Sequence, residues 1–158
     1  MRTPWVIGVS LLASSFSAWA VPSFCNEDFR VIVNNQNSGI VDGRTQIIDN
    51  EADYCDVWNE LYSLQWPAPA CDTSLVDFST EFAVLVAVGE RWDGCHNVDI
   101  GCVVRTPADR IGVVAIETEP GPMCLCTDNI VYPSVLAVVE RPFTQAQFRT
   151  IVQPLQCP

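Results

Sequence analysis

The sequence predicts an α+β domain, mainly antiparallel β in a sandwich or barrel-like arrangement, with one main helix and disulfide bracing. Three observations lead to this prediction. Short apolar, β-branched runs recur between turn-forming residues, which is typical of strands in antiparallel sheets. One segment, residues 51–65, carries the apolar period of an amphipathic helix. The chain of 158 residues contains 8 cysteines, and an even number of cysteines in an exported chain favours disulfides.

Residues 1–20 are expected to form a signal peptide rather than part of the fold. Arg2 gives a positive start, residues 5–13 are apolar but too short to cross a bilayer, and Ala18-Trp19-Ala20 matches the small-x-small pattern that signal peptidase reads. Cleavage after Ala20 leaves residues 21–158, a length that fits a single domain with an ordinary core. We therefore expect a soluble protein that is exported to the periplasm or the extracellular space.

The first part of the domain predicts two strands. Residues 29–33 are a β-branched run, and the turn formers of residues 34–39 follow them. Residues 45–48 have the composition of a second short strand. Both strands therefore precede the helix.

The helix is expected to run from Glu51 to about Gln65. Asp49 or Asn50 can cap it, because a short side-chain oxygen accepts a hydrogen bond from a free N–H of the first turn. Its apolar face contains Tyr54, Val57, Trp58, Leu61 and Leu64. The Trp-Pro pair that follows ends the helix.

After the helix the apolar period becomes that of strands. Residues 82–88 form a continuous apolar run, which favours a strand buried on both faces. The segment Gly89–His96 is expected to be a hairpin turn, held at Cys95. Further strands are expected at residues 98–104, 111–119, 124–127 and 134–139, and residues 146–152 form either a last strand or a helical turn.

The cysteines are expected to pair with one another. Eight cysteines allow about 105 pairings, of which two have a rationale. Cys25 and Cys157 lie near the chain ends, which are often close in space, and Cys55 and Cys71 flank the helix and its following loop. The other four would then pair among themselves, although Cys124 and Cys126 are too close in sequence to form an unstrained bridge. The full set is Cys25, Cys55, Cys71, Cys95, Cys102, Cys124, Cys126 and Cys157.

The charge of the chain limits its partners. Asp and Glu number 19 against 8 basic residues, a net charge of −11, and every basic residue is an arginine. A field of this sign repels nucleic acid and anionic lipid. It suits a well-solvated surface or a cationic partner. We expect no nucleic acid and no membrane span, because no later apolar run approaches the length of a spanning helix.

The loop after residue 88 holds the candidate binding residues. Trp92 beside Arg91 is typical of a recognition anchor on a loop, although the ring could instead fold back over the sheet edge. Two acids on one tip, such as Asp93 and its neighbour Glu90, are more often solvated than catalytic. Together with His96, the single histidine, these residues form the expected contact site for a protein partner: Arg91, Trp92, Asp93 and His96.

Catalytic and metal-binding alternatives have weak support in the sequence. A nucleophile–histidine pair of Cys95 and His96 needs a free thiol, and adjacent strand residues point to opposite faces. The cysteine and histidine spacings do not match the usual zinc patterns, and export disfavours thiolates. The zinc ligands so considered are Cys95, His96, Cys102, Cys124 and Cys126. We therefore expect no catalytic residue, no cofactor and no bound metal.

The order of several short motifs resembles that of the PrcB-like family, the C-terminal domain of a protease-complex stability subunit. The resemblance covers residues 38–148. It departs from the family at Tyr62, where a second tryptophan is usual, and at Cys95, where a second glycine is usual. The matching motifs are Ser38-Gly39-Ile40, Ile47-Ile48, Trp58-x-x-Leu61, Val76-Asp77-Phe78, the apolar strand ending in Gly89, Pro120-Gly121 followed by Cys124, and Tyr132-Pro133.

This resemblance implies a noncatalytic accessory domain that binds and stabilises a secreted protease or another envelope protein. Its candidate contact surfaces are Gly89–His96 and the loop Pro120–Cys126. Two other functions stay open. The protein could be a protease inhibitor that presents residues 90–96 or 120–126 to an active-site cleft, or an enzyme of unrecognised type, which would need a deep polar pocket around His96.

Overall fold

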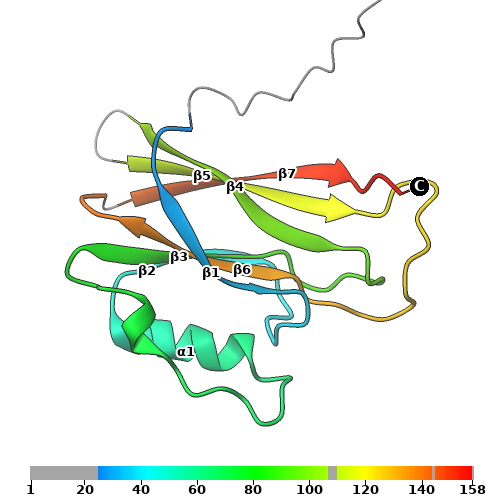
Figure 1. Ribbon diagram of the computed structural model, residues 1–158, viewed down its shortest axis with the longest axis horizontal. Helices are drawn as coiled ribbons and strands as arrows, with labels where there is room; N and C mark the ends of the chain where they lie inside the picture. The colour runs from blue at the N-terminus through cyan, green and yellow to red at the C-terminus, as the bar shows by residue number, and fades with distance from the viewer. Residues whose placement is uncertain (1–24, 107–109, 144, 158) are drawn as a thin grey trace, which may run out of the picture.

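The computed structural model describes residues 25–106, 110–143 and 145–157, so the expected signal peptide lies outside the described residues. Within them one α-helix and two β-sheets form three layers, with the helix on one face of the larger sheet and the smaller sheet on the other (Figure 1). The elements are β1 (Phe29–Asn35), β2 (Arg44–Ile48), α1 (Glu51–Leu61), a 3₁₀ turn η1 (Thr73–Leu75), β3 (Glu81–Ala87), β4 (Asn97–Thr106), β5 (Arg110–Glu119), β6 (Ser134–Glu140) and β7 (Gln145–Pro154).

The strand order confirms the predicted α+β class. The larger sheet has the order β1-β6-β3-β2, and all its neighbours are antiparallel. The smaller sheet has the order β4-β5-β7, in which β4 and β5 are antiparallel but β5 and β7 are parallel. Residues 145–154 thus form a strand rather than a helical turn. The prediction of a strand at residues 124–127 is wrong, because this segment is a loop whose cysteines bond to other parts of the chain.

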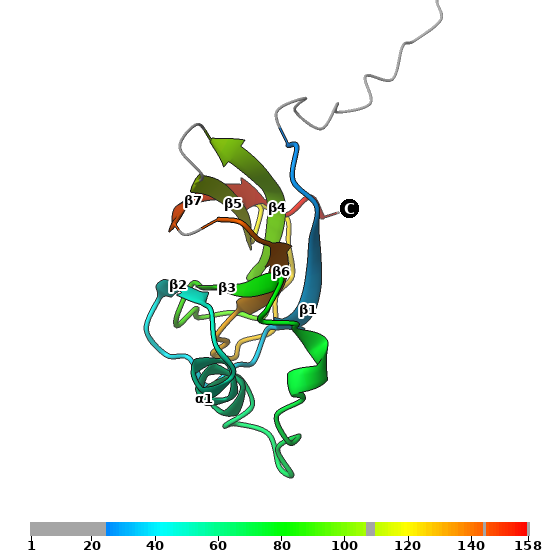
Figure 2. The same cartoon turned by 90° about the vertical axis from the view of Figure 1, so that its left-hand side faces the viewer.

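The core lies on both faces of the larger sheet. Its central strands β3 and β6 are buried almost throughout, as the continuous apolar run predicts. Because strand side chains alternate between faces, Leu85 and Leu136 pack under α1, whereas Val84 and Val135 pack against the smaller sheet. Figure 2 shows the two sheets stacked with the helix beneath them. The described residues include no helix with the length and apolar character needed to cross a bilayer.

The helix starts where the sequence predicts and ends earlier. Asn50 caps α1, since its side-chain oxygen accepts a hydrogen bond from the Asp53 N–H at 2.9 Å. The expected end at Gln65 is wrong. The Glu60 carbonyl accepts hydrogen bonds from the Gly39 N–H at 3.2 Å and the Ser63 N–H at 3.2 Å. The segment after β1 thus satisfies a terminal carbonyl of the helix, and α1 stops at Leu61.

All eight cysteines form disulfides, but only part of the predicted pairing is right. Cys55 bonds to Cys71 as expected. The expected Cys25–Cys157 bond is wrong, because β1 enters beside β4 while the C-terminus ends beside the loop after β5. The four disulfides are Cys25–Cys102, Cys55–Cys71, Cys95–Cys126 and Cys124–Cys157.

Candidate functional site

The loop that follows β3 is a crossing between sheets and not the hairpin that the sequence predicts. Strand β3 belongs to the larger sheet, whereas β4 pairs with β5 in the smaller one. The chain leaves β3 through Gly89, which has φ of 79°, a backbone conformation that favours glycine. A Cβ on Gly89 would also lie 2.7 Å from the Gly43 backbone nitrogen. The close approach of the two backbones therefore requires glycine at position 89, where the chain leaves the larger sheet.

Two disulfides join this loop to two others. Cys95 bonds to Cys126 in the loop after β5, and Cys124 of the same loop bonds to Cys157 near the C-terminus. We call these three segments, residues 89–96, 120–131 and 155–157, the stapled end. They lie at one end of the molecule, where the C-terminus is marked in Figure 1.

Backbone hydrogen bonds reinforce the staples. The Arg91 and Val131 N–H groups each donate to the other residue's carbonyl at 2.9 Å, and the Gly94 N–H donates to the Thr127 carbonyl at 3.0 Å. Gln36 follows directly after β1. Its side-chain amide donates to the Gly94 carbonyl at 2.8 Å and to the His96 carbonyl at 2.6 Å. The loop after β3 is thus fixed from both sides.

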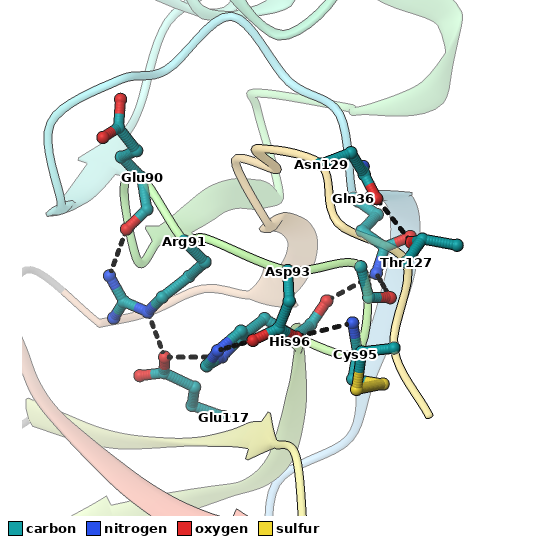
Figure 3. Close-up of polar contacts among 11 residues, drawn as sticks. Gln36, Glu90, Arg91, Asp93, Cys95, His96, Glu117, Thr127 and Asn129 are labelled. Atoms are coloured by element: carbon teal, nitrogen blue, oxygen red, sulfur yellow. Dashed lines mark hydrogen bonds and ion pairs between the residues drawn. A yellow bond between two sulfur atoms is a disulfide. The ribbon is translucent and has the colours of Figure 1, made fainter. Parts of the chain in front are cut away.

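An ionic cluster links the stapled end to β5 (Figure 3). Arg91 Nε is 2.6 Å from Oε1 of Glu117, a residue of β5 that is only 7% exposed. His96 Nε2 lies 3.4 Å from Asp93 Oδ2, and His96 Nδ1 lies 3.9 Å from Glu117 Oε1. Asp93 also accepts a hydrogen bond from the Cys95 N–H at 3.0 Å. A buried carboxylate is stable only when it is paired, so Arg91 is a structural partner of Glu117.

This cluster leaves little room for acid–base chemistry. His96 Nε2 lies against Asp93, and Nδ1 is buried without a hydrogen-bond partner among the described residues. Only 13% of the side chain is exposed, so a substrate would reach the imidazole only if this loop moved. The adjacent pocket, of about 320 Å³, is an open depression lined by Arg91 and Glu117 but not by His96. The arrangement therefore serves to hold the loop.

The cysteine–carboxylate grouping at this end does not offer a free metal site. Ligand atoms of Asp93, Cys95 and Cys126 lie within 4.8 Å of one another. The two sulfurs are bonded to each other, however, and a metal needs the thiolate form of cysteine. Only the carboxylate of Asp93 is left as a ligand.

Above the cluster the stapled end exposes large apolar side chains. Trp92 is 73% exposed, Met123 is 75% exposed and Leu125 is fully exposed. We call these three residues the apolar tip. Trp92 does not fold back over the sheet edge, which was the alternative to a binding anchor. Exposed aromatic and long apolar side chains are the usual anchors of protein contacts, so the three residues of the apolar tip are the candidate binding residues.

The structure divides the four predicted contact residues into two groups. Trp92 points into solvent, whereas Arg91, Asp93 and His96 are engaged with Glu117 or with each other. Sequence reasoning missed Glu117, although a signal for it exists. Residues 111, 113 and 115 alternate inward along β5, and Glu117 occupies the next inward position. An acidic residue at an inward-facing position of a strand predicts an oppositely charged side chain beside it in the interior.

No protein-family model, curated protein or solved structure matches this chain. The resemblance to the PrcB-like family therefore stays a prediction, and the partner that it implies is a proposal.

Proposed function

We propose that the protein is an exported, noncatalytic binding domain that associates with and stabilises a secreted or envelope protein, a protease among the candidates. The observation that carries this proposal is the exposure of Trp92, Met123 and Leu125 on loops that disulfides hold in place. Aromatic and long apolar anchors dominate the binding energy of protein interfaces.

The rigidity of the stapled end supports a binding role. Leu125 stands between Cys124 and Cys126, and both cysteines are bonded to other segments. A loop that is already fixed loses little conformational entropy when a partner binds. The apolar tip can therefore contribute to affinity without a prior ordering step.

The charge of the chain supports a cationic partner surface. The net charge is −11, which speeds the approach of a basic protein at low ionic strength. The apolar tip itself carries no charge. We expect a partner that combines an apolar pocket with a basic rim.

The test is capture of partners by the purified, oxidised protein from the secreted proteins of the organism that makes it. Trp92→Ala and Leu125→Asp should each reduce capture of the same partner at least about tenfold, the effect of losing one anchor of ~1.4 kcal/mol or more. Both variants should unfold like the parent protein, because neither side chain is buried.

A matched control is present in the loop after α1. Trp66 is almost fully exposed in the loop after α1 and takes no part in the stapled end. Trp66→Ala should leave capture unchanged. If Trp66→Ala abolishes capture while Trp92→Ala does not, the binding surface lies at the loop after α1 and the proposal fails.

Protease inhibition is the alternative function, and one observation favours it. Leu125 is fully exposed between two bonded cysteines, a placement suited to filling the specificity pocket of a protease from residues 120–126. Residues 90–96 offer Trp92 in the same way. In an inhibitor, the loop enters the active-site cleft, so catalysis stops.

Incubation with the captured protease separates the two functions. A stabiliser should lengthen the half-life of protease activity and leave the initial rate unchanged. An inhibitor should lower the initial rate at once, and Leu125→Asp should restore it. Conversion of an added substrate by the protein alone would contradict both functions. It would support the remaining possibility, an enzyme of unrecognised type.

A further inference from the structure

The two sheets have four edge strands, and three of them are protected against pairing with another chain. An exposed strand edge presents unpaired N–H and C=O groups that can bind a further strand. The outer edge of β4 is covered by the segment before β1. There the Glu27 N–H donates to the Val103 carbonyl at 3.3 Å, and the Arg105 N–H donates to the Asn26 side chain at 2.8 Å. The Cys25–Cys102 disulfide fixes this cover.

Strands β1 and β2 are protected in other ways. The pairing of β1 with β6 contains an irregularity between Val31 and Val33, and a bulge of this kind twists an edge away from regular pairing. Strand β2 has only 5 residues and carries Arg44. Short, charged edges pair poorly with other chains.

Within the described residues, strand β7 is not covered, bulged or short, although it carries one charged residue, Arg149. It runs for 10 residues at the edge of the smaller sheet, and its pairing with β5 is unbroken from Gln145 to Pro154. Its second half is exposed on both faces, including the apolar side chains of Ile151 at 37% and Val152 at 50%. A long, regular, partly apolar edge is a ready site for an added strand.

We infer that β7 pairs in antiparallel fashion with β7 of a second copy of the chain, so that the two smaller sheets form one continuous sheet. The charge of the strand favours this occupant. Strand β7 contains no acidic residue, although the chain has 19, so two copies can approach here without opposing carboxylates.

A twofold axis at Thr150 gives the most favourable register. It places Arg149 opposite Ile151 of the second copy and Phe148 opposite Val152 of the second copy. Directly opposed side chains interact most strongly across an antiparallel pair. The stem of Arg149 then covers the exposed Ile151 of the second copy, and the two Arg149 residues are diagonal rather than directly opposed neighbours.

Analytical ultracentrifugation of the purified protein tests this inference across about 1 to 100 μM, where modest interfaces associate. The parent protein should sediment as a dimer at the upper end of this range. Ile151→Lys places a second positive charge opposite Arg149 and should weaken association at least about tenfold. Ile151→Glu places a carboxylate opposite Arg149 and should retain the dimer.

Val31→Lys provides the matched control, because Val31 is also an exposed apolar residue on an edge strand. It should leave the dimer intact, and far-ultraviolet circular dichroism should show that all variants are folded. A parent protein that stays monomeric at the highest concentration overturns the inference. So does a dimer that Ile151→Lys leaves unchanged, or one that both Ile151 variants dissociate equally. A monomer whose Ile151→Lys variant loses a captured protein assigns the edge to a partner segment instead, and also overturns it.

Discussion

The helix side of the molecule and its stapled end are held together by different means. On the helix side, α1 buries Tyr54, Val57, Trp58 and Leu61 against the larger sheet, so apolar burial supplies most of the stability beside the Cys55–Cys71 disulfide. At the stapled end the large apolar side chains face solvent, and two disulfides and an ion pair hold the loops. Covalent and ionic bracing therefore leaves apolar side chains available for a partner.

The largest expected effect contrasts one leucine from each region. Leu61→Ala removes a fully buried side chain beneath α1 and should lower the free energy of unfolding by about 3–4 kcal/mol. Leu125→Ala at the apolar tip should change it by less than about 0.5 kcal/mol. Urea unfolding of both variants measures the difference. Similar losses of unfolding free energy in the two variants would show that Leu125 is packed rather than exposed. That result would contradict the difference between the two regions.

Removal of one staple should loosen the stapled end selectively. The double variant Cys95→Ser, Cys126→Ser opens a bridge that spans 31 residues, which should cost about 3 kcal/mol. Amide hydrogen exchange should accelerate most at the two backbone hydrogen bonds between Arg91 and Val131. The matched variant Cys55→Ser, Cys71→Ser should leave those amides protected. Equal acceleration throughout the protein in both variants would mean that the two regions are not held independently.

Two of the arginine–glutamate pairs among the described residues, Arg91–Glu117 and Arg44–Glu60, should differ in their contribution to stability. Arg91→Ala leaves Glu117 buried without its partner and should lower the free energy of unfolding by about 2–3 kcal/mol. Arg44→Ala should cost less than about 1 kcal/mol, because Glu60 is 40% exposed and solvent screens the pair. The Arg44 side chain nevertheless lowers the pKa of Glu60. A larger loss for Arg44→Ala would reverse this assignment.

The last stability prediction is a gain, at Tyr54. Its hydroxyl is buried and has no hydrogen-bond partner among the described residues. Tyr54→Phe should therefore raise the free energy of unfolding by about 1 kcal/mol near neutral pH. A loss of stability in thermal unfolding would show that the hydroxyl has a partner, such as a buried water.

Tyr54 also gives the helix side a defined alkaline response. Burial raises the pKa of Tyr54 from 10.0 to about 12, so the folded state favours the neutral phenol. This contribution is complete below pH 10 and is lost as the pH rises from 10 toward 12. Tyr54→Phe should remove this part of the alkaline destabilisation. An unchanged pH profile would contradict the assignment to Tyr54.

The local signals of the sequence predicted the frame of the fold. The continuous apolar run of residues 82–88 predicts a central strand because both of its faces must be buried, and Asn50 predicts the helix start through its own side chain. The end of α1 could not be predicted in this way, since the Glu60 carbonyl bonds to Gly39, which is distant in sequence. The partner of Cys25 is likewise set by how β1 lies beside β4.

The candidate site was predicted only in part for a related reason. Trp92 is a loop residue whose type and position single it out as a candidate anchor, but the sequence alone leaves open whether its ring is exposed or folds back over the sheet edge. Arg91 and His96 look equally available in the sequence. Their carboxylate partner Glu117 comes from another strand and reaches them only after the sheets stack. Long-range pairing thus separates the contact residues from the bracing residues.

Peptide mapping of the nonreduced protein by mass spectrometry tests the central claim most directly, which is that covalent bridges hold the loops that carry the apolar tip. Digestion should yield the linked pairs Cys95–Cys126 and Cys124–Cys157 and no free thiol at these four positions. Free thiols there, or a bridge from Cys157 to Cys25, would contradict the account.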